Sequence, residues 1–348
     1  MSCVFSQACA SRFKFEPWTR TRYLPAVRKF LACLCLTLAV ALRLGAETNV
    51  VVLTPATTNA PENPELVQAE FQKLLAADNA AQAEADRWVQ DNQKFAAQGG
   101  GISKEDLRLK IQTRFAGVRK AYDDFLQRHP DHVPCLLAYG SLLNDLADEV
   151  AAAVQWERAS TLAPTNPATW NNLANHAAGS GDPKKAFEYF ERSIALAPNV
   201  ATYRRNLGSA IVHFRTNAMA YYELGEQPVL DKGLKFLRQA QKQEPDDFPL
   251  ATEIAQIYYG LEPPRVDEAI QAWDFAQKLA VDEVERDGVR LHLARVNLQA
   301  GRFEEARRQL GLIKYEGYAD LKRKLAEQLA QAETPAATTN APPSVPKP

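Results

Sequence analysis

Residues Pro167–Val200 read PATWNNLANHAAGSGDPKKAFEYFERSIALAPNV. The stretch lacks the strict alternation of apolar and polar residues that is typical of a β-strand. Pro198 ends its second half, because proline has no amide hydrogen and disfavours helix in the residue before it. Two antiparallel helices of about a dozen residues each, with two turns, use about 34 residues. The stretch therefore predicts one helix pair.

The same spacing recurs on both sides of this stretch. Small residues recur where two helices would cross, and large ones recur where neighbouring pairs would meet. The matches at a separation of 34 are Pro130, Pro164 and Pro198; Gly140, Ala174 and Gly208; Ala152 and Ala186; Trp156 and Phe190; and Ala159 and Ser193. Several residue types sharing one period indicate a repeat protein built from helix pairs.

The best unit resembles the tetratricopeptide repeat family. Its matches to the family pattern W-x2-L-G…A-x3-F…P are Trp170, Leu173, Ala174, Ala186, Phe190 and Pro198. Ala174 replaces the pattern's glycine, and Ala177 replaces a usual tyrosine. The resemblance covers roughly residues 115–333. It implies an all-α fold, a right-handed superhelical solenoid of antiparallel helix pairs, with about five units over residues 131–317.

The array has an expected beginning and end. Residues 64–130 are predicted to form a long αα-hairpin that begins at Pro64, turns at Gly99–Gly101 and precedes the repeats. Residues 318–333 are predicted to be a capping helix with a charged outer face. The basic clusters Arg204–Arg205 and Lys322–Lys324 are interpreted as solvated faces.

The third unit contains an insertion at residues 217–229. Ala218–Leu224 is expected to extend the first helix as far as Gly225, and Glu226–Leu230 is expected to return in extended form. Two tyrosines, Tyr221 and Tyr222, either fold back onto a neighbouring unit, near Tyr258 and Tyr259, or form a second binding site. We favour the packing interpretation.

The N-terminal 46 residues have the layout of a secretory signal peptide. Arg28 and Lys29 precede an apolar run over residues 30–42, and small residues follow up to Ala46. The run is shorter than the roughly 20 residues of a membrane-spanning helix. Cleavage near Ala46-Glu47 and a periplasmic or secreted location are expected, with an uncleaved anchor as the alternative. Residues before Val27 delay the apolar run, so translation starting near residue 27 is a further possibility.

Composition indicates the character of the two segments that flank the predicted helices and of the chain as a whole. Residues 47–63 are expected to be a flexible linker and residues 334–348 a disordered tail, because both are poor in large apolar side chains. Four of the five cysteines lie in the leader, which leaves Cys135. The net charge is −1 and residues 1–46 carry +6, which leaves −7 for the remainder. An acidic body of this kind argues against nucleic-acid binding.

No catalytic motif is found, so the chain is not expected to be an enzyme. The sequence lacks G-x-S-x-G, a Walker loop and H-E-x-x-H. His129 and His132 flank Pro130–Asp131, which interrupts the helix face that two metal ligands would need. Cys135 falls in the first turn of a packed helix, where a small apolar filler is expected. We expect no metal and no cofactor.

The resemblance also implies a place for a partner. In the family, the first helix of each unit lines the concave side of the solenoid. Carried over position by position, the groove residues are Ser141, Asn144, Asn171, Asn175, Arg205, Ser209, His213, Thr252, Gln256, Tyr259, Arg295 and Gln299. Amide and hydroxyl groups donate and accept hydrogen bonds, which suits an extended peptide. The expected function is a monomeric protein-binding scaffold of the cell envelope. The alternatives are an accessory subunit of an envelope enzyme and a structural spacer.

Overall fold

The computed structural model describes residues 63–97 and 99–333, and every regular element within those ranges is helical. The all-α prediction is therefore confirmed. The expected signal peptide, the possible start at residue 27, nearly all of the linker and the C-terminal tail lie outside the described residues. The chain divides between Glu70 and Phe71 into two units, and the arrangement below is that of the second unit.

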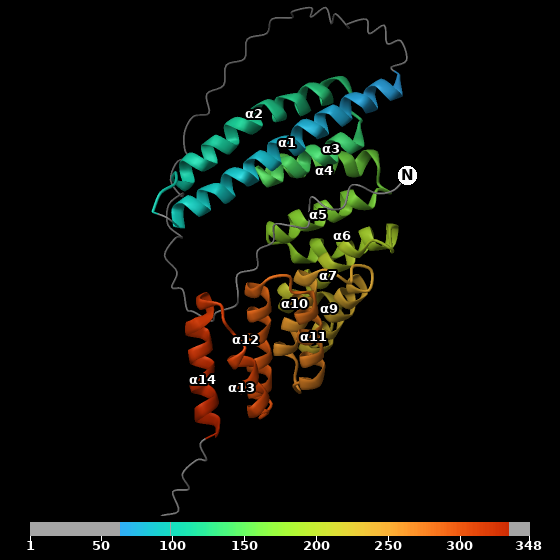
Figure 1. Ribbon diagram of the computed structural model, residues 1–348. Coiled ribbons are helices and arrows are strands. Elements are labelled where there is room, and N and C mark those ends of the chain that lie inside the picture. Colours follow the sequence, from blue (N-terminus) through green and yellow to red (C-terminus); the bar gives the residue numbers. More distant parts are fainter. Residues whose placement is uncertain (1–62, 98, 334–348) are drawn as a thin grey trace, which may run out of the picture. The chain divides into compact units, whose positions relative to one another are not determined.

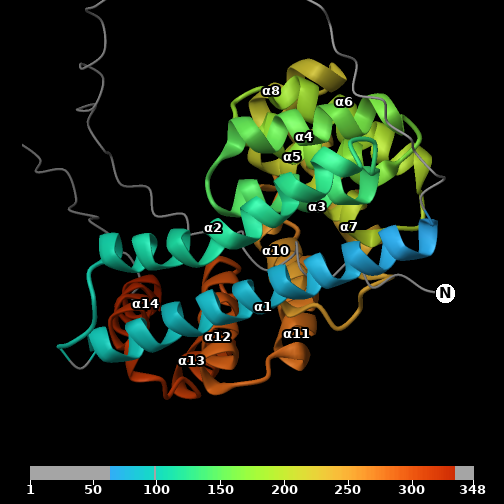
Figure 2. The same cartoon turned by 90° about the horizontal axis from the view of Figure 1, so that it is seen from above.

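Two long helices precede the repeats, α1 (Pro64–Ala97) and α2 (Lys104–Arg128). Ser103 begins α2 as its N-cap, because its hydroxyl oxygen accepts the Asp106 amide at 3.0 Å. Beyond Phe71, α1 packs along α2, and the buried Tyr122 hydroxyl donates to the Asp78 carboxylate at 2.7 Å. The ring of Tyr122 stacks on Tyr139 of the first repeat, with centroids 4.9 Å apart. The hairpin is thus joined to the array (Figures 1 and 2).

Five helix pairs follow in chain order (Figure 1). They are α3 (Val133–Asp145) with α4 (Glu149–Leu162), α5 (Pro167–Gly179) with α6 (Pro183–Leu196), α7 (Ala201–His213) with α9 (Glu226–Gln241), α10 (Phe248–Ile257) with α11 (Val266–Leu279), and α12 (Glu283–Gln299) with α13 (Phe303–Gly311). The 3₁₀ turns η1 (Tyr258–Gly260) and η2 (Glu316–Tyr318) follow α10 and α13, and α14 (Ala319–Glu333) is last. The helices of each pair contact each other, and the second helix of the pair contacts the first helix of the next pair.

The turn inside a pair has the same backbone geometry in three of the five pairs. Ala147, Gly181 and Gly301 adopt positive φ angles of 62°, 84° and 70°. In each turn the next amide closes a 2.8 Å bond to a carbonyl five residues earlier, which is the longer bond of the Schellman motif. Ala147 stands 34 residues before Gly181, so the repeat keeps this conformation even where the residue is not glycine.

Small residues lie where the helices of a pair cross, as the sequence predicts. A Cβ atom on Gly208 of α7 would lie 3.0 Å from the Gly233 carbonyl oxygen of α9. A Cβ atom on Gly233 would lie 3.2 Å from the Gly208 carbonyl oxygen. The two backbones are therefore in direct contact. In the first pair, the Trp156 indole of α4 lies directly against Gly140 of α3, so a large side chain and a glycine meet at this crossing.

The insertion differs from the expectation. It forms a separate helix, α8 (Arg215–Tyr222), and it ends at Glu223, which has a left-handed φ of 54°, rather than at Gly225. Glu226–Leu230 is the start of α9, not an extended return. Pro228 is the third residue of α9, and proline is tolerated in a first turn because those amides have no partner within the helix.

The two inserted tyrosines pack onto the preceding unit. The hydroxyls of Tyr221 and Tyr222 donate to opposite oxygens of Glu191, at 3.1 and 2.9 Å. Both rings lie against Phe187, with centroids 5.3 and 5.7 Å away. Packing is the interpretation we favoured, but the partner helix is α6 and not the segment around Tyr258 and Tyr259.

Candidate partner-binding surface

We call the sides of α3, α5, α7, α10 with the following η1 turn, and α12 that carry the twelve predicted residues the first-helix surface. From α5 to α12, polar contacts join neighbouring parts of it. Between α5 and α7, the Asn206 side-chain amide donates to the Asn171 side-chain oxygen at 2.8 Å. Asn171 is only 7% exposed, so its side chain fixes the neighbouring helix and offers little surface to a ligand.

A charged cluster joins α7 to α10. Arg205 donates to Asp247 at 2.6 Å and lies 3.7 Å from Glu253. The Ser209 hydroxyl also donates to Glu253. Asp247 in turn caps α10, because its other carboxylate oxygen accepts the Leu250 amide at 2.7 Å. Arg205 and Ser209 are therefore paired within the protein, and interpreting Arg205 as part of a solvated face was wrong.

Burial dominates the electrostatics of this cluster. Desolvation raises the pKa of Glu253, and the Ser209 hydrogen bond and the Arg205 charge lower it by less. The cluster holds one guanidinium and two carboxyl groups, so it is a structural ion-pair network with an acidic excess.

Aromatic residues join η1 to α12. The Tyr259 hydroxyl lies 3.0 Å from Nδ1 of His292, and the His292 ring stacks on the buried Trp273 at 4.1 Å. Arg295 lies over the Tyr259 ring, 6.0 Å from its centroid. Burial, and then the charge of Arg295, lower the pKa of His292 to about 4. The imidazole is therefore neutral at pH 7.

The depressed pKa of His292 predicts a pH effect on stability. The folded state disfavours the imidazolium, so the stabilisation is complete above pH 6.5 and is lost as the pH falls toward 4. The loss is roughly 3 kcal/mol over that interval. His292→Phe keeps the ring stack but cannot be protonated. The unfolding free energy of the wild type minus that of this variant, measured by denaturant titration, should fall by that amount from pH 7.5 to 4. A difference that is the same at both pH values would contradict the depressed pKa of His292.

The other predicted residues fall into two groups. Two half-buried hydroxyls are satisfied within their own helices, because Ser141 donates to the Leu137 carbonyl and Thr252 donates to that of Pro249. The predicted side chains that are exposed on the first-helix surface are Asn144, His213, Gln256, Tyr259, Arg295 and Gln299, and Asn175 is half-buried. About half of the predicted residues are therefore exposed.

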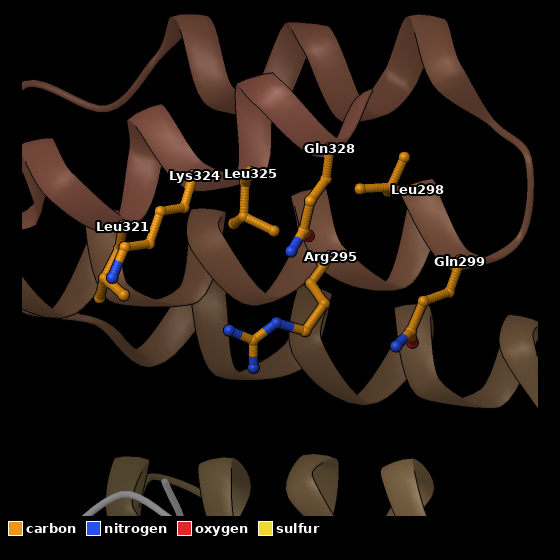
Figure 3. Close-up of a pocket in the computed structure, with 7 residues that line it drawn as sticks. All are labelled: Arg295, Leu298, Gln299, Leu321, Lys324, Leu325 and Gln328. Atoms are coloured by element: carbon orange, nitrogen blue, oxygen red, sulfur yellow. The ribbon is translucent and has the colours of Figure 1, made fainter. Parts of the chain in front are cut away.

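A pocket of about 360 Å³ lies where α12 meets α14 (Figure 3). The residues that line it are Arg295, Leu298 and Gln299 of α12 and Leu321, Lys324, Leu325 and Gln328 of α14. Arg295 and Gln299 were predicted from the sequence, and the α14 residues were not. The signal present in the sequence was the cationic run at 322–324, which we interpreted as a solvated face of a cap.

The residues considered for other chemistry are part of the core. Cys135 is fully buried, and burial raises the pKa of its thiol to about 12, so it carries no thiolate at pH 7. His132 caps α3, because its Nδ1 accepts the Cys135 amide at 3.1 Å. Its ring packs against Phe71 and Phe125. Within residues 63–97 and 99–333, no helix has the length and apolarity needed to cross a membrane.

The α5–α6 pair can be compared with a known family. It occupies the segment that matches a family model, over residues 167–200. The match is to the tetratricopeptide repeat. The tetratricopeptide match covers this one pair, whereas the other four pairs share its helix order and its chain of contacts. No curated protein is significantly similar to the chain in sequence.

Several solved structures have similar helical arrays. YrrB, described as a tetratricopeptide repeat protein with an unusual peptide-binding site, is 12% identical, covers 62% of this chain and 98% of its own, and has a TM-score of 0.47. PilF of Pseudomonas aeruginosa is 13% identical, covers 71% and 99%, and has a TM-score of 0.47. The tetratricopeptide repeat protein TTC0263 of Thermus thermophilus is 24% identical, covers 57% and 99%, and has a TM-score of 0.39.

Proposed function

We propose that the protein is a non-catalytic scaffold that binds an extended segment of a partner protein along the first-helix surface. The observation that carries the proposal is the row of contacts through which Asn171, Arg205, Ser209 and Tyr259 hold successive first helices side by side. A surface fixed in this way loses little conformational entropy when it binds a ligand. Proteins with tetratricopeptide repeats generally bind protein or peptide partners, and residues 167–200 match that repeat.

The exposed side-chain amides of the first-helix surface favour a peptide as the ligand. Asn144, Gln256 and Gln299 present amides that can donate to backbone carbonyls and accept from backbone amides. A repeating row of such groups fits a segment whose own polar groups repeat along its length. The proposed site of action is the cell envelope or the exterior, which rests on the basic and apolar pattern before Ala46.

The test selects peptides and then blocks the surface. Random twelve-residue peptides are displayed and selected on the purified chain, and the affinities of the winners are measured by fluorescence anisotropy. Gln256→Trp and Gln299→Trp place bulk on exposed positions of first helices. Glu188→Trp and Lys235→Trp place the same bulk on exposed positions of the second helices α6 and α9.

The proposal expects the first two variants to weaken binding by roughly tenfold or more, because a clash must be relieved in the bound state. The two controls should bind as the wild type does. Failure to select any peptide would favour the structural spacer. Loss of binding in the controls alone would place the partner on the opposite side of the pairs.

A further inference from the structure

The last helix does more than close the array. The side of α14 that faces α12 carries Leu321, which is 45% exposed, above the buried Leu325. Figure 3 shows the α14 side chains facing those of α12 across the pocket. A helix that only capped the core would turn its polar side outward and leave no hollow beside it that is lined by leucine, amide and cationic side chains together. The α12–α14 pocket is therefore a feature that capping does not explain.

The charges around the pocket are uncompensated. Arg323, the neighbour of Lys324, is paired with Glu327 at 2.9 Å and with Asp320 at 3.4 Å. Lys324 and Arg295, by contrast, have no carboxylate within ion-pair distance among the residues that the structure describes. No acid lines the pocket. Two cations share one hollow and repel each other until an anion is bound.

The pocket is also built in advance. Lys322 donates to the Ile313 carbonyl at 2.9 Å, which ties α14 to the preceding loop. The buried Asp287 of α12 accepts the amides of Lys314 and Tyr315 at 2.7 and 2.8 Å, which ties the same loop to α12. The two walls are thus held at a fixed separation, and a ligand need not order them.

We propose that the α12–α14 pocket binds an acidic side chain of the partner segment, with Arg295 and Lys324 on its carboxylate and an adjacent aliphatic side chain on Leu298 and Leu321. This inference rests on the proposed function and adds its specificity: the segment carries glutamate or aspartate next to a leucine-like residue. Hydrogen bonds from cationic donors to a carboxylate are stronger than neutral ones. Gln299 and Gln328 can bond the adjoining backbone.

A protein segment fits these surroundings better than a polyanion. The exposed acids Asp320 and Glu327 lie on α14 within four residues of Lys324. The chain beyond residue 46 has a net charge of −7. Nucleic acid needs a broad basic footprint, and two cations in a small hollow do not supply one.

The experiment is a positional scan with acetylated hexapeptide amides, in which each position is fixed in turn as Glu, Asp, Gln, Lys, Leu or Phe. Binding is measured to the wild type, to the double variant Arg295→Glu/Lys324→Glu, and to the control Arg323→Glu. Arg323 lies on the same helix but outside the pocket, so the control makes the same kind of charge reversal at one site that the pocket does not include. Circular dichroism confirms that each variant is folded.

The wild type should prefer Glu or Asp to Gln by roughly tenfold at one position, next to a position that prefers Leu. The double variant should prefer Lys there, and the control should keep the acidic preference. Binding without any acidic preference, or an acidic preference that survives in the double variant, would overturn the pocket assignment while leaving the scaffold proposal intact. Absence of binding to every peptide would overturn both.

Discussion

Replacing Trp170 with alanine should lower the free energy of unfolding by about 3–5 kcal/mol, because a large aromatic ring lost from a packed interface leaves a cavity. The side chain is 8% exposed, and its indole N–H donates to the Pro164 carbonyl at 2.8 Å. The Arg192 guanidinium covers the ring at 3.6 Å. The measurement is a guanidinium titration followed by circular dichroism.

Trp170→Phe is the matched variant for this prediction. It keeps most of the apolar ring but removes the hydrogen bond to Pro164, so its loss should be the smaller one, about 1–2 kcal/mol. A loss below about 1 kcal/mol for Trp170→Ala would contradict the packed environment of the ring beside Tyr189 and Arg192.

Replacing Asp287 with alanine should cost about 3–5 kcal/mol, because one partner of a buried, hydrogen-bonded ion pair is removed. Its carboxylate is fully buried and accepts Arg290 at 2.7 Å in addition to the amides of Lys314 and Tyr315. The change leaves the two amides without an acceptor and leaves the Arg290 guanidinium with the Leu312 carbonyl at 3.0 Å. The substitution should also free α14 from α12 and abolish the pocket. Peptide binding should therefore weaken in the same variant that loses stability.

The pH dependence of this variant provides a second readout. Burial alone would raise the pKa of Asp287, but the amides of Tyr315 and Lys314 and the side chain of Arg290 outweigh it and hold the pKa below 3.8. The stabilisation is therefore complete above that value and is lost as the pH falls through the folded pKa. The difference in unfolding free energy between the wild type and Asp287→Ala, measured by denaturant titration at several pH values, should be constant near neutrality and become smaller below about pH 4. A gap that widens on acidification would contradict the assignment.

The repeat could be read from sequence because its constraints are local and recur. The residue at position 208 must be small because two helices touch there, and Pro198 follows the end of α6 because proline cannot continue the interior of a helix. The insertion could not be read in the same way. Pro228 was interpreted as part of a return loop, but proline in the first turn of a helix costs no internal hydrogen bond. Glu223 ends α8 in the left-handed conformation that we assigned to a glycine.

The candidate site was harder to predict because its partners are remote in sequence. Arg205 looks like an open cation until Asp247 and Glu253, more than 40 residues later, are brought to it. Asn171 similarly meets Asn206 of the next pair. Positions taken from a family motif identify the side of a helix. They do not say whether the side chain there is already paired within the protein.

The α14 contribution was missed for a related reason. Lys322, Arg323 and Lys324 look equivalent as a run of cations, yet each has a different environment in the structure. The first donates to a carbonyl, the second is ion-paired, and the third lines the pocket. Helical rotation separates consecutive residues by about 100°, so the pattern of the run cannot reveal which one faces α12.

Photo-crosslinking tests the scaffold account most directly. A photoreactive phenylalanine derivative is placed at Gln256 or Asn144 on the first helices and, as controls, at Lys235 or Glu304 on the second helices, all of them exposed. A selected peptide is added, and the crosslinked fraction is measured by mass spectrometry. The account predicts crosslinks at Gln256 and Asn144 that an excess of unlabelled peptide removes, and none above background at Lys235 and Glu304. Equal crosslinking at all four positions, or crosslinking only on the second helices, would contradict it.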